Sequence, residues 1–263
     1  MTAVARAFAV AVAAVVAAVV TILVWPHSSA PSRAAEQAER FPASPKPAFV
    51  VPRPVRLSHS VAVSYWASVR EEALARMSPS AGAPVVADLP TTTPEGTTNI
   101  VLVLGRRTDG SGRLWVHVRL AVLPNRRTAW VPRRALGVYG VVHTHLVVNL
   151  EGLTATLLRD GRPVFRASIG VGQPQWPTPR GQFYIRNRLR GFSDPIYGPI
   201  AFGTSARSSV LTDWPAGGYI GIHGTNQPAL LPGRVSHGCI RMRNADILRL
   251  AKVLPIGTPV TIL

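Results

Sequence analysis

The sequence predicts a mainly β protein in which two β modules follow an N-terminal apolar helix. Short β-rich runs, separated by Gly, Pro, Asn and Thr, recur from residue 83 to the C-terminus. One segment near the C-terminus, 244–254, has apolar residues at helical spacing. Residues 7–25 form a long run without a charged side chain. We therefore expect strands to dominate the fold, with one appended helix and one apolar segment at the start.

The apolar run Ala7–Trp25 has 19 residues, follows Arg6 and is dominated by Ala and Val. At about 1.5 Å rise per residue, a helix of this length crosses the apolar core of a bilayer. A cleaved signal peptide has the same layout, and Ser28–Ala30 offers small residues for cleavage. The length favours an uncleaved anchor in residues 1–25. Both alternatives place the rest of the chain outside the cytoplasm.

Residues 26–56 are rich in Pro, Ala, Ser and Arg and are predicted to be a linker. So many prolines favour an extended, polyproline-like spacer over a packed core. Residues 57–140 follow as a predicted β module with a short leading helix. The helix is predicted from the capping-box pattern Ser68–Glu71 and is expected to run through Met77 and end at Pro79.

The predicted strands of this module are 85–86, 100–104, 115–120 and 129–131. In the third run, Val116 and Val118 alternate with more polar side chains, which is typical of a half-buried strand. The stretch 115–136 resembles the small SH3-like barrel that often precedes the catalytic domain of bacterial cell-wall enzymes. Trp115 and Trp130 are candidates for glycan or peptide contacts, but in so small a barrel we expect them in the core.

Residues 141–263 are predicted to form a second, mostly antiparallel β module with one helix. The expected strands are 145–150, 154–158, 164–169, 182–187, 219–223 and 259–263. Asp160-Gly161 between the second and third of these is a hairpin signal. Asn244 is the expected N-cap of the helix. Its predicted apolar face consists of Ile247, Leu248, Leu250, Ala251 and Leu254.

The charge balance points to an anionic environment. The chain has 29 Lys and Arg against 12 Asp and Glu, a formal net charge of +17, spread over both halves. Such an excess predicts contact with a polyanion. Because the chain is expected to be exported, nucleic acid is excluded as the partner.

Cys239 is the single cysteine, which excludes an intramolecular disulfide framework and a cysteine-rich zinc module. A cysteine nucleophile needs a base, positive surroundings that hold the thiolate beside an imidazolium, and backbone amides for the oxyanion. His223 at a strand end is the candidate base, Arg241 supplies charge, and Gly238 lets the backbone turn. The rival interpretation is a zinc site formed by His223, His237 and Cys239.

Two motifs make the region recognisable, His223–Thr225 and Ser236–Met242. Three further segments accompany them, Pro177–Phe183, Tyr197–Phe202 and Pro255–Val260. Together they resemble the bacterial L,D-transpeptidase catalytic domain over residues 143–263. The resemblance implies a β-sandwich cysteine enzyme that acts on peptidoglycan stem peptides, needs no cofactor or metal, and is acylated by carbapenems.

By this resemblance, Cys239 is the nucleophile and His223 the general base. Ser236 and His237 would support the loop, and the amides of Gly238 and Cys239 would bind the oxyanion. A backbone carbonyl would orient His223, since Gly224 stands where some members have serine. Arg241 would remain a source of positive charge.

The implied reaction joins two stem peptides. Cys239 would attack a donor tetrapeptide at its third residue, expel D-alanine and pass the thioester to an acceptor amine. The expected partners are these stem peptides, anionic wall polymers and, through the N-terminal helix, the membrane. The alternatives are a carboxypeptidase or protein-attachment enzyme that uses the same thioester, and a catalytically silent wall-binding protein. A papain-like hydrolase is disfavoured because there the cysteine precedes the histidine.

Overall fold

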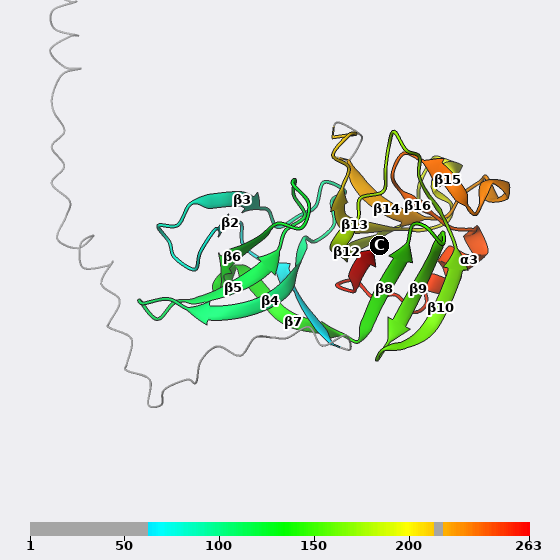
Figure 1. The fold of residues 1–263 in the computed structure, drawn as a ribbon. Coiled ribbons are helices and arrows are strands. Elements are labelled where there is room, and N and C mark those ends of the chain that lie inside the picture. Colours follow the sequence, from blue (N-terminus) through cyan, green and yellow to red (C-terminus); the bar gives the residue numbers. More distant parts are fainter. Residues whose placement is uncertain (1–62, 213–217) are drawn as a thin grey trace, which may run out of the picture. The chain divides into compact units, whose positions relative to one another are not determined.

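The computed structural model describes residues 63–212 and 218–263 (Figure 1). The predicted anchor or signal peptide, 1–25, and the predicted linker, 26–56, lie outside these ranges. Within the ranges, no helix combines the length and the apolar character that crossing a bilayer requires. The described chain forms two β-sheets and one α-helix, so the prediction of a mainly β fold is confirmed.

The first sheet has seven antiparallel strands in the order β3-β2-β6-β5-β4-β1-β7. Its strands are β1 (Ser64–Val69), β2 (Ala73–Arg76), β3 (Val85–Leu89), β4 (Ile100–Thr108), β5 (Leu114–Arg119), β6 (Thr128–Pro132) and β7 (Leu136–Val142). A 3-10 turn, η1 (Arg133–Ala135), joins the last two. Figure 1 shows β4, β5 and β6 side by side, as their pairing requires.

Alternation along β5 builds the core of this sheet. Val116 and Val118 are fully buried on one face and pack with the aliphatic side chains of the neighbouring strands. Trp115 is only 1% exposed, and its indole N–H donates to Asp109 at 2.8 Å. Trp115 is therefore a core residue, as predicted, whereas Trp130 is half-buried and stacks on His117 at 4.8 Å between ring centroids.

The predicted helix over 68–77 is wrong, because this segment forms β1 and β2. Ser68, the expected helix cap, is instead paired with Ile100 of β4. Ala67 and Val69 on β1 are buried between β4 and β7. The capping pattern is a local preference worth about 1 kcal/mol, and strand pairing that buries apolar side chains outweighs it.

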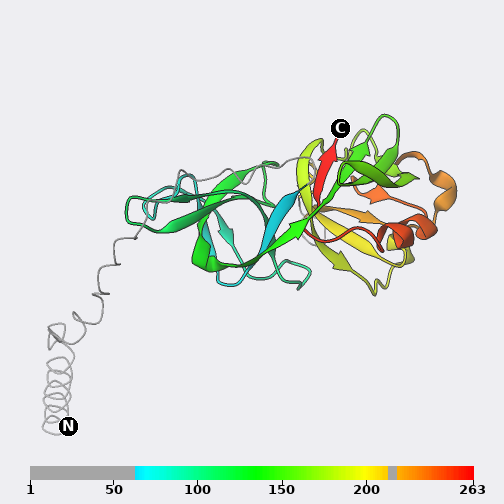
Figure 2. The ribbon, with the colours of Figure 1, turned by 90° about the horizontal axis from the view of Figure 1, so that it is seen from below.

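The second sheet has ten strands in the order β10-β9-β8-β17-β12-β13-β14-β16-β11-β15. They are β8 (Thr144–Asn149), β9 (Thr154–Arg159), β10 (Arg162–Ser168), β11 (Gly170–Gly172), β12 (Gly181–Leu189), β13 (Ala201–Arg207), β14 (Tyr219–His223), β15 (Gly233–Ser236), β16 (Ile240–Arg241) and β17 (Pro259–Ile262). Three pairs are parallel: β17 with β8, β14 with β16, and β11 with β15. In Figure 2 the red C-terminal strand β17 lies beside the green β8.

The hairpin predicted at Asp160-Gly161 is confirmed. It joins β9 and β10, and both turn residues have positive φ, 51° and 77°. Positive φ at both central residues is the requirement of a type I′ turn, which matches the twist of the two strands.

The helix α3 (Asn244–Leu250) differs from the prediction at two residues. Asn244 is its first residue, not its N-cap, and its side-chain oxygen accepts the Thr225 N–H at 2.9 Å. Leu248 is 47% exposed and is not part of the buried face. The buried residues of the helix are Ile247 and Leu250, and Ala251 and Leu254, which follow the helix, pack into the same core of the second sheet.

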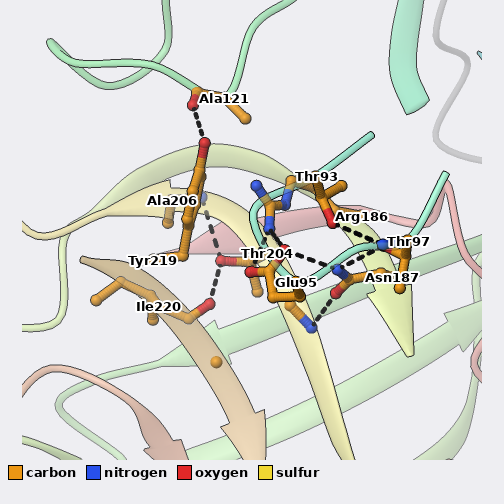
Figure 3. A network of polar contacts seen from close by, with 12 residues as sticks. Thr93, Glu95, Thr97, Ala121, Arg186, Asn187, Thr204, Ala206, Tyr219 and Ile220 are labelled. Carbon is orange, nitrogen blue, oxygen red and sulfur yellow. Dashed lines mark hydrogen bonds and ion pairs between the residues drawn. The ribbon is translucent and has the colours of Figure 1, made fainter. Parts of the chain in front are cut away.

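Polar contacts join the two sheets at the start of β14 (Figure 3). Glu95, in the β3–β4 connection, accepts from Arg186 on β12 at 2.7 and 2.8 Å. The Arg186 guanidinium carbon lies 3.6 Å from the ring centroid of Tyr219. The Tyr219 hydroxyl in turn donates to the Ala121 carbonyl at 2.9 Å. These contacts fix the first residue of β14, the strand that ends at His223.

Candidate active site

A pocket of about 260 Å³ opens over the strand ends β14 and β16. The 3-10 turn η2 (Pro195–Tyr197) contributes one wall. The residues that line the pocket include Tyr197, Tyr219, His223, Ser236, His237, Cys239 and Arg241. The structure thus brings most of the sequence-predicted site residues to one cavity.

The parallel pairing of β14 and β16 places the single cysteine next to His223. Ile222 is in register with Ile240, and His223 with Arg241. The preceding Gly221 therefore lies beside Cys239, and its backbone N–H points at the sulfur with an N···Sγ distance of 3.4 Å. A Cβ atom added to Gly221 would lie 3.8 Å from both the Cys239 sulfur and the His223 Cδ2. The thiol and the imidazole therefore both lie next to Gly221, on neighbouring positions of the sheet.

The backbone carbonyl of Gly224 orients His223. The distance from Nδ1 to this oxygen is 2.6 Å. A carbonyl only accepts, so the contact requires a proton on Nδ1 and leaves the lone pair on Nε2. The Tyr197 ring packs edge-on at 5.1 Å between centroids. The hydrogen bond from Nδ1 to the Gly224 carbonyl is the interaction that the resemblance predicts for a chain with glycine at 224.

Burial keeps the imidazole neutral. His223 is 3% exposed, and this burial lowers its pKa to about 4, with a smaller lowering by the Arg241 charge. The Gly224 hydrogen bond opposes the shift. Burial also raises the pKa of the Cys239 thiol, against the lowering by the Gly221 N–H and Arg241.

The pKa shifts of His223 and Cys239 contradict the expected pairing of a thiolate with an imidazolium. A resting thiolate beside an imidazolium is not favoured, because the pKa of His223 lies far below neutrality while that of Cys239 is raised. The site at neutral pH holds a thiol and a neutral imidazole whose Nε2 is available as a base.

Ser236 holds the loop that carries the thiol. Its hydroxyl donates to the Cys239 carbonyl at 2.5 Å and accepts from the Gly238 N–H at 3.1 Å. Gly238 has φ of 113°, and a Cβ there would lie 3.1 Å from Ile220. The positive φ disfavours a side chain at 238, and a Cβ there would also require the end of the Ile220 side chain to shift. The Gly238 N–H, which the resemblance predicts as an oxyanion donor, donates to the Ser236 hydroxyl oxygen in this structure.

His237 occupies the rim of the same pocket. Its side chain is exposed, and its ring is tilted by 34° against Trp176 with 4.0 Å between centroids. The two site histidines therefore differ: His223 is buried beneath the pocket, while His237 packs on an aromatic side chain at its edge.

Among residues 63–212 and 218–263, no group of three or more His, Cys, Asp or Glu side chains has an arrangement that could hold a metal ion. The rival zinc site would need His223, His237 and Cys239 to converge. The His223 Nδ1 is already bound to the Gly224 carbonyl.

Comparisons with known proteins identify the family of this chain. Residues 143–262 match the family model described as the L,D-transpeptidase catalytic domain. YqjB of Bacillus subtilis, whose name describes an L,D-transpeptidase, is 30% identical over 45% of this chain and 70% of its own length. The chain belongs to the L,D-transpeptidase catalytic domain family.

Three further proteins are similar to this chain. YkuD of Bacillus subtilis, also named as an L,D-transpeptidase, is 39% identical over 45% of this chain and 65% of its own length. The match to YkuD of Bacillus licheniformis covers 64% of that protein, so the chain spans slightly under two thirds of these curated relatives. The solved catalytic domain of an Enterococcus faecium L,D-transpeptidase is 25% identical, over 46% of this chain and 96% of that one, with a TM-score of 0.34.

Sequence reasoning about this L,D-transpeptidase domain missed the role of Thr178. Its buried hydroxyl donates to the Gly238 carbonyl at 2.7 Å and accepts from the Gly172 N–H at 2.9 Å. It thus ties β11 to the loop before Cys239. Thr178 lies in the quoted motif Pro177–Phe183, but 60 residues separate it from Gly238, and only the fold reveals the contact.

Proposed function

We propose that this chain is a peptidoglycan L,D-transpeptidase in which Cys239 is the nucleophile and His223 the general base. One observation supports this most strongly. The register of β14 and β16 places the Cys239 sulfur within hydrogen-bonding distance of the Gly221 N–H. The neighbouring His223 ring is oriented by its Nδ1 contact with the Gly224 carbonyl, which leaves the Nε2 lone pair available. This combination supplies a nucleophile and an oriented base in one pocket.

In the first half of the reaction, the Cys239 sulfur attacks the carbonyl carbon of the third residue in a donor tetrapeptide. The thiol proton passes to His223 Nε2 as the C–S bond forms, because the two groups begin neutral. The C–N bond to the terminal D-alanine then breaks, and the imidazolium returns its proton to the leaving amine. The product is a thioester on Cys239.

In the second half, the side-chain amine of another stem peptide attacks the thioester carbonyl. His223 takes a proton from this amine, the C–S bond breaks, and the proton returns to the sulfur. The backbone N–H of Cys239 is the proposed oxyanion donor, because the Gly238 N–H already donates to Ser236. Ser236 and Thr178 maintain the loop around the reacting sulfur.

The remaining parts of the proposal concern the setting of the enzyme. Residues 1–25 would anchor or export the chain, 26–56 would act as a spacer, 57–140 would form the SH3-like module and 141–263 the catalytic β-sandwich. The net charge of +17 suits a wall whose stems and accessory polymers carry carboxylates and phosphates.

The test is incubation of the purified full chain with disaccharide-tetrapeptide fragments, read by mass spectrometry. Transpeptidation predicts dimers joined between the third residues, with one D-alanine lost per dimer. Tripeptides without dimers would identify a carboxypeptidase instead. If neither product forms, the result would favour the alternative of a catalytically silent wall-binding protein. The Cys239→Ser variant is the matched control for both reactions.

A further inference from the structure

Arg241 has a buried guanidinium for which residues 63–212 and 218–263 provide no acceptor. It lines the pocket that contains Cys239 and is 9% exposed. In the described ranges no carbonyl, carboxylate or hydroxyl accepts from it, and its Nε is buried without a partner. A buried charge without a counter-charge is costly. The fold therefore holds a cation whose donors are left for a ligand.

The acidic side chain that lines the same pocket does not act as the counter-charge of Arg241. Asp194 lines the same pocket, but its carboxylate accepts the Ile196 N–H at 2.9 Å, and it makes no ion pair with Arg241 in the part of the chain that the structure describes. The position of Arg241 is fixed by its backbone, which pairs with His223 on β14 and with Gly170 on β11.

The guanidinium lies on the same side of its strand as the nucleophile. Cys239 immediately precedes β16, Arg241 is the second residue of that strand, and both line the pocket. Alternate residues of an extended chain share a face at a spacing of about 7 Å. A group that Arg241 binds therefore lies within a few bonds of the carbonyl that the sulfur attacks.

We propose that Arg241 binds a carboxylate of the acyl donor on the leaving side of the scissile bond. This rests on the proposed function. The carboxylate of a single leaving residue is three bonds from the scissile carbonyl carbon, roughly 4 Å, whereas a second leaving residue would carry the charge about 3.5 Å further away. The planar fork of an arginine matches a carboxylate in bidentate geometry. Arg241 thus selects donors that end one residue after the attacked carbonyl.

The first test uses two alkylating reagents that differ in charge. Iodoacetate and iodoacetamide both transfer their carbon to the sulfur and release iodide, and Cys239 is the single cysteine of the chain. We expect Arg241→Gln to lower the ratio of the iodoacetate rate to the iodoacetamide rate about ten-fold, the size of one charge-assisted contact. The ratio cancels changes in thiol pKa, because both reagents attack the same thiolate.

Arg188→Gln is the matched control, since it removes the same charge from an exposed position on β12 outside the pocket. An equal fall in both variants would overturn the proposal, because it would reflect net charge alone. Arg241→Lys keeps the charge but loses the fork, and we expect it to restore part of the ratio. This test needs no transpeptidation, so it stands if the proposed reaction fails.

The second test needs no variant. The wild-type chain is given a donor tetrapeptide with a free terminal carboxylate or with a terminal amide, and acylation is followed by intact mass. We expect the free acid to acylate about ten-fold faster, by the same charge-assisted contact. Equal acylation rates would overturn the carboxylate assignment. Acylation by neither donor, with the alkylation ratio still dependent on Arg241, would contradict the proposed function and leave the anion site in place.

Discussion

At the scale of single residues, the chemistry depends on the ionisation of two buried side chains. The pKa of His223 is lowered to about 4 from an ordinary 6.5, so the imidazole is neutral above about pH 5. Burial raises the pKa of the Cys239 thiol from an ordinary 9.0. In the proposed reaction the thiol proton therefore leaves the sulfur during the attack and not before it.

The ionisation predicts the pH profile of thiol alkylation. With iodoacetamide, we expect the wild-type rate to rise steadily through the alkaline range, because the thiol becomes a thiolate only there. No plateau of reactive thiolate should extend down toward pH 5. The measurement is the second-order alkylation rate against pH. A plateau between about pH 5 and 8 would instead reveal a preformed thiolate–imidazolium pair.

His223 and His237 should respond differently to truncation. His223→Ala removes the positioned base, and we expect acylation to slow by about two to four orders of magnitude. His237→Ala removes a ring that packs on Trp176 at the pocket rim, so we expect a much smaller loss. Single-turnover acylation by a donor peptide measures both. A greater loss in His237→Ala would reverse the assignment of the base.

At the scale of elements, the loop before Cys239 depends on hydroxyls that reach it from outside β16. Thr178→Val keeps the shape of the side chain but leaves the Gly172 N–H and the Gly238 carbonyl without their partner. We expect the free energy of unfolding to fall by about 1–3 kcal/mol, with slower acylation as the loop loosens. Thermal unfolding measures the first effect. Thr178→Ser keeps the hydroxyl and should retain most of the activity, and a full loss in Thr178→Ser would contradict this role.

The same scale shows where sequence reasoning succeeds and fails. Alternation predicts β5, and the Asp160-Gly161 turn predicts its hairpin, because these signals are local. The segment 68–77 does not form the predicted helix, because β1 pairs with β4 and β7 and β2 pairs with β3 and β6, and these partners cannot be read from the local sequence. Asn244 was assigned to capping because its true partner, Thr225, is brought near only by the fold.

For the site, the motifs predict which residues meet but not their ionisation. Cys239 and His223 adjoin as expected, because their strands are neighbours in the sheet. The neutral state of His223 follows from burial, and the partner of the Gly238 amide follows from the loop conformation. Neither property is encoded in residue types alone.

At the scale of the whole chain, the two sheets are coupled through Glu95 and Arg186. The Arg186 side chain is 1% exposed and the Glu95 side chain 13%, and the residues are 91 positions apart. No pattern in a single sequence predicts such a pair. Arg186 also lies over the ring of Tyr219, which lines the candidate pocket, so a single side chain separates the Glu95–Arg186 pair from that pocket.

Removal of one partner tests this coupling. We expect Glu95→Gln to lower the free energy of unfolding by about 3 kcal/mol, because it leaves a buried guanidinium without its counter-charge. The double variant with Arg186→Met removes the buried charge as well and should lose less than the sum of the two single variants. Denaturant unfolding of the four proteins measures the cycle. Strict additivity would show that the pair does not interact energetically.

The central claim is that Cys239 carries the acyl group as a thioester. The most direct measurement is the intact mass of the full chain after brief exposure to a donor tetrapeptide, with peptide mapping of the adduct. We predict a single adduct of the donor minus its terminal alanine, located on Cys239, released by hydroxylamine and absent from Cys239→Ser, whose hydroxyl is too weakly acidic for one histidine to activate. An adduct that persists in Cys239→Ser, or a wild-type chain that forms cross-links with its thiol blocked, would contradict the claim.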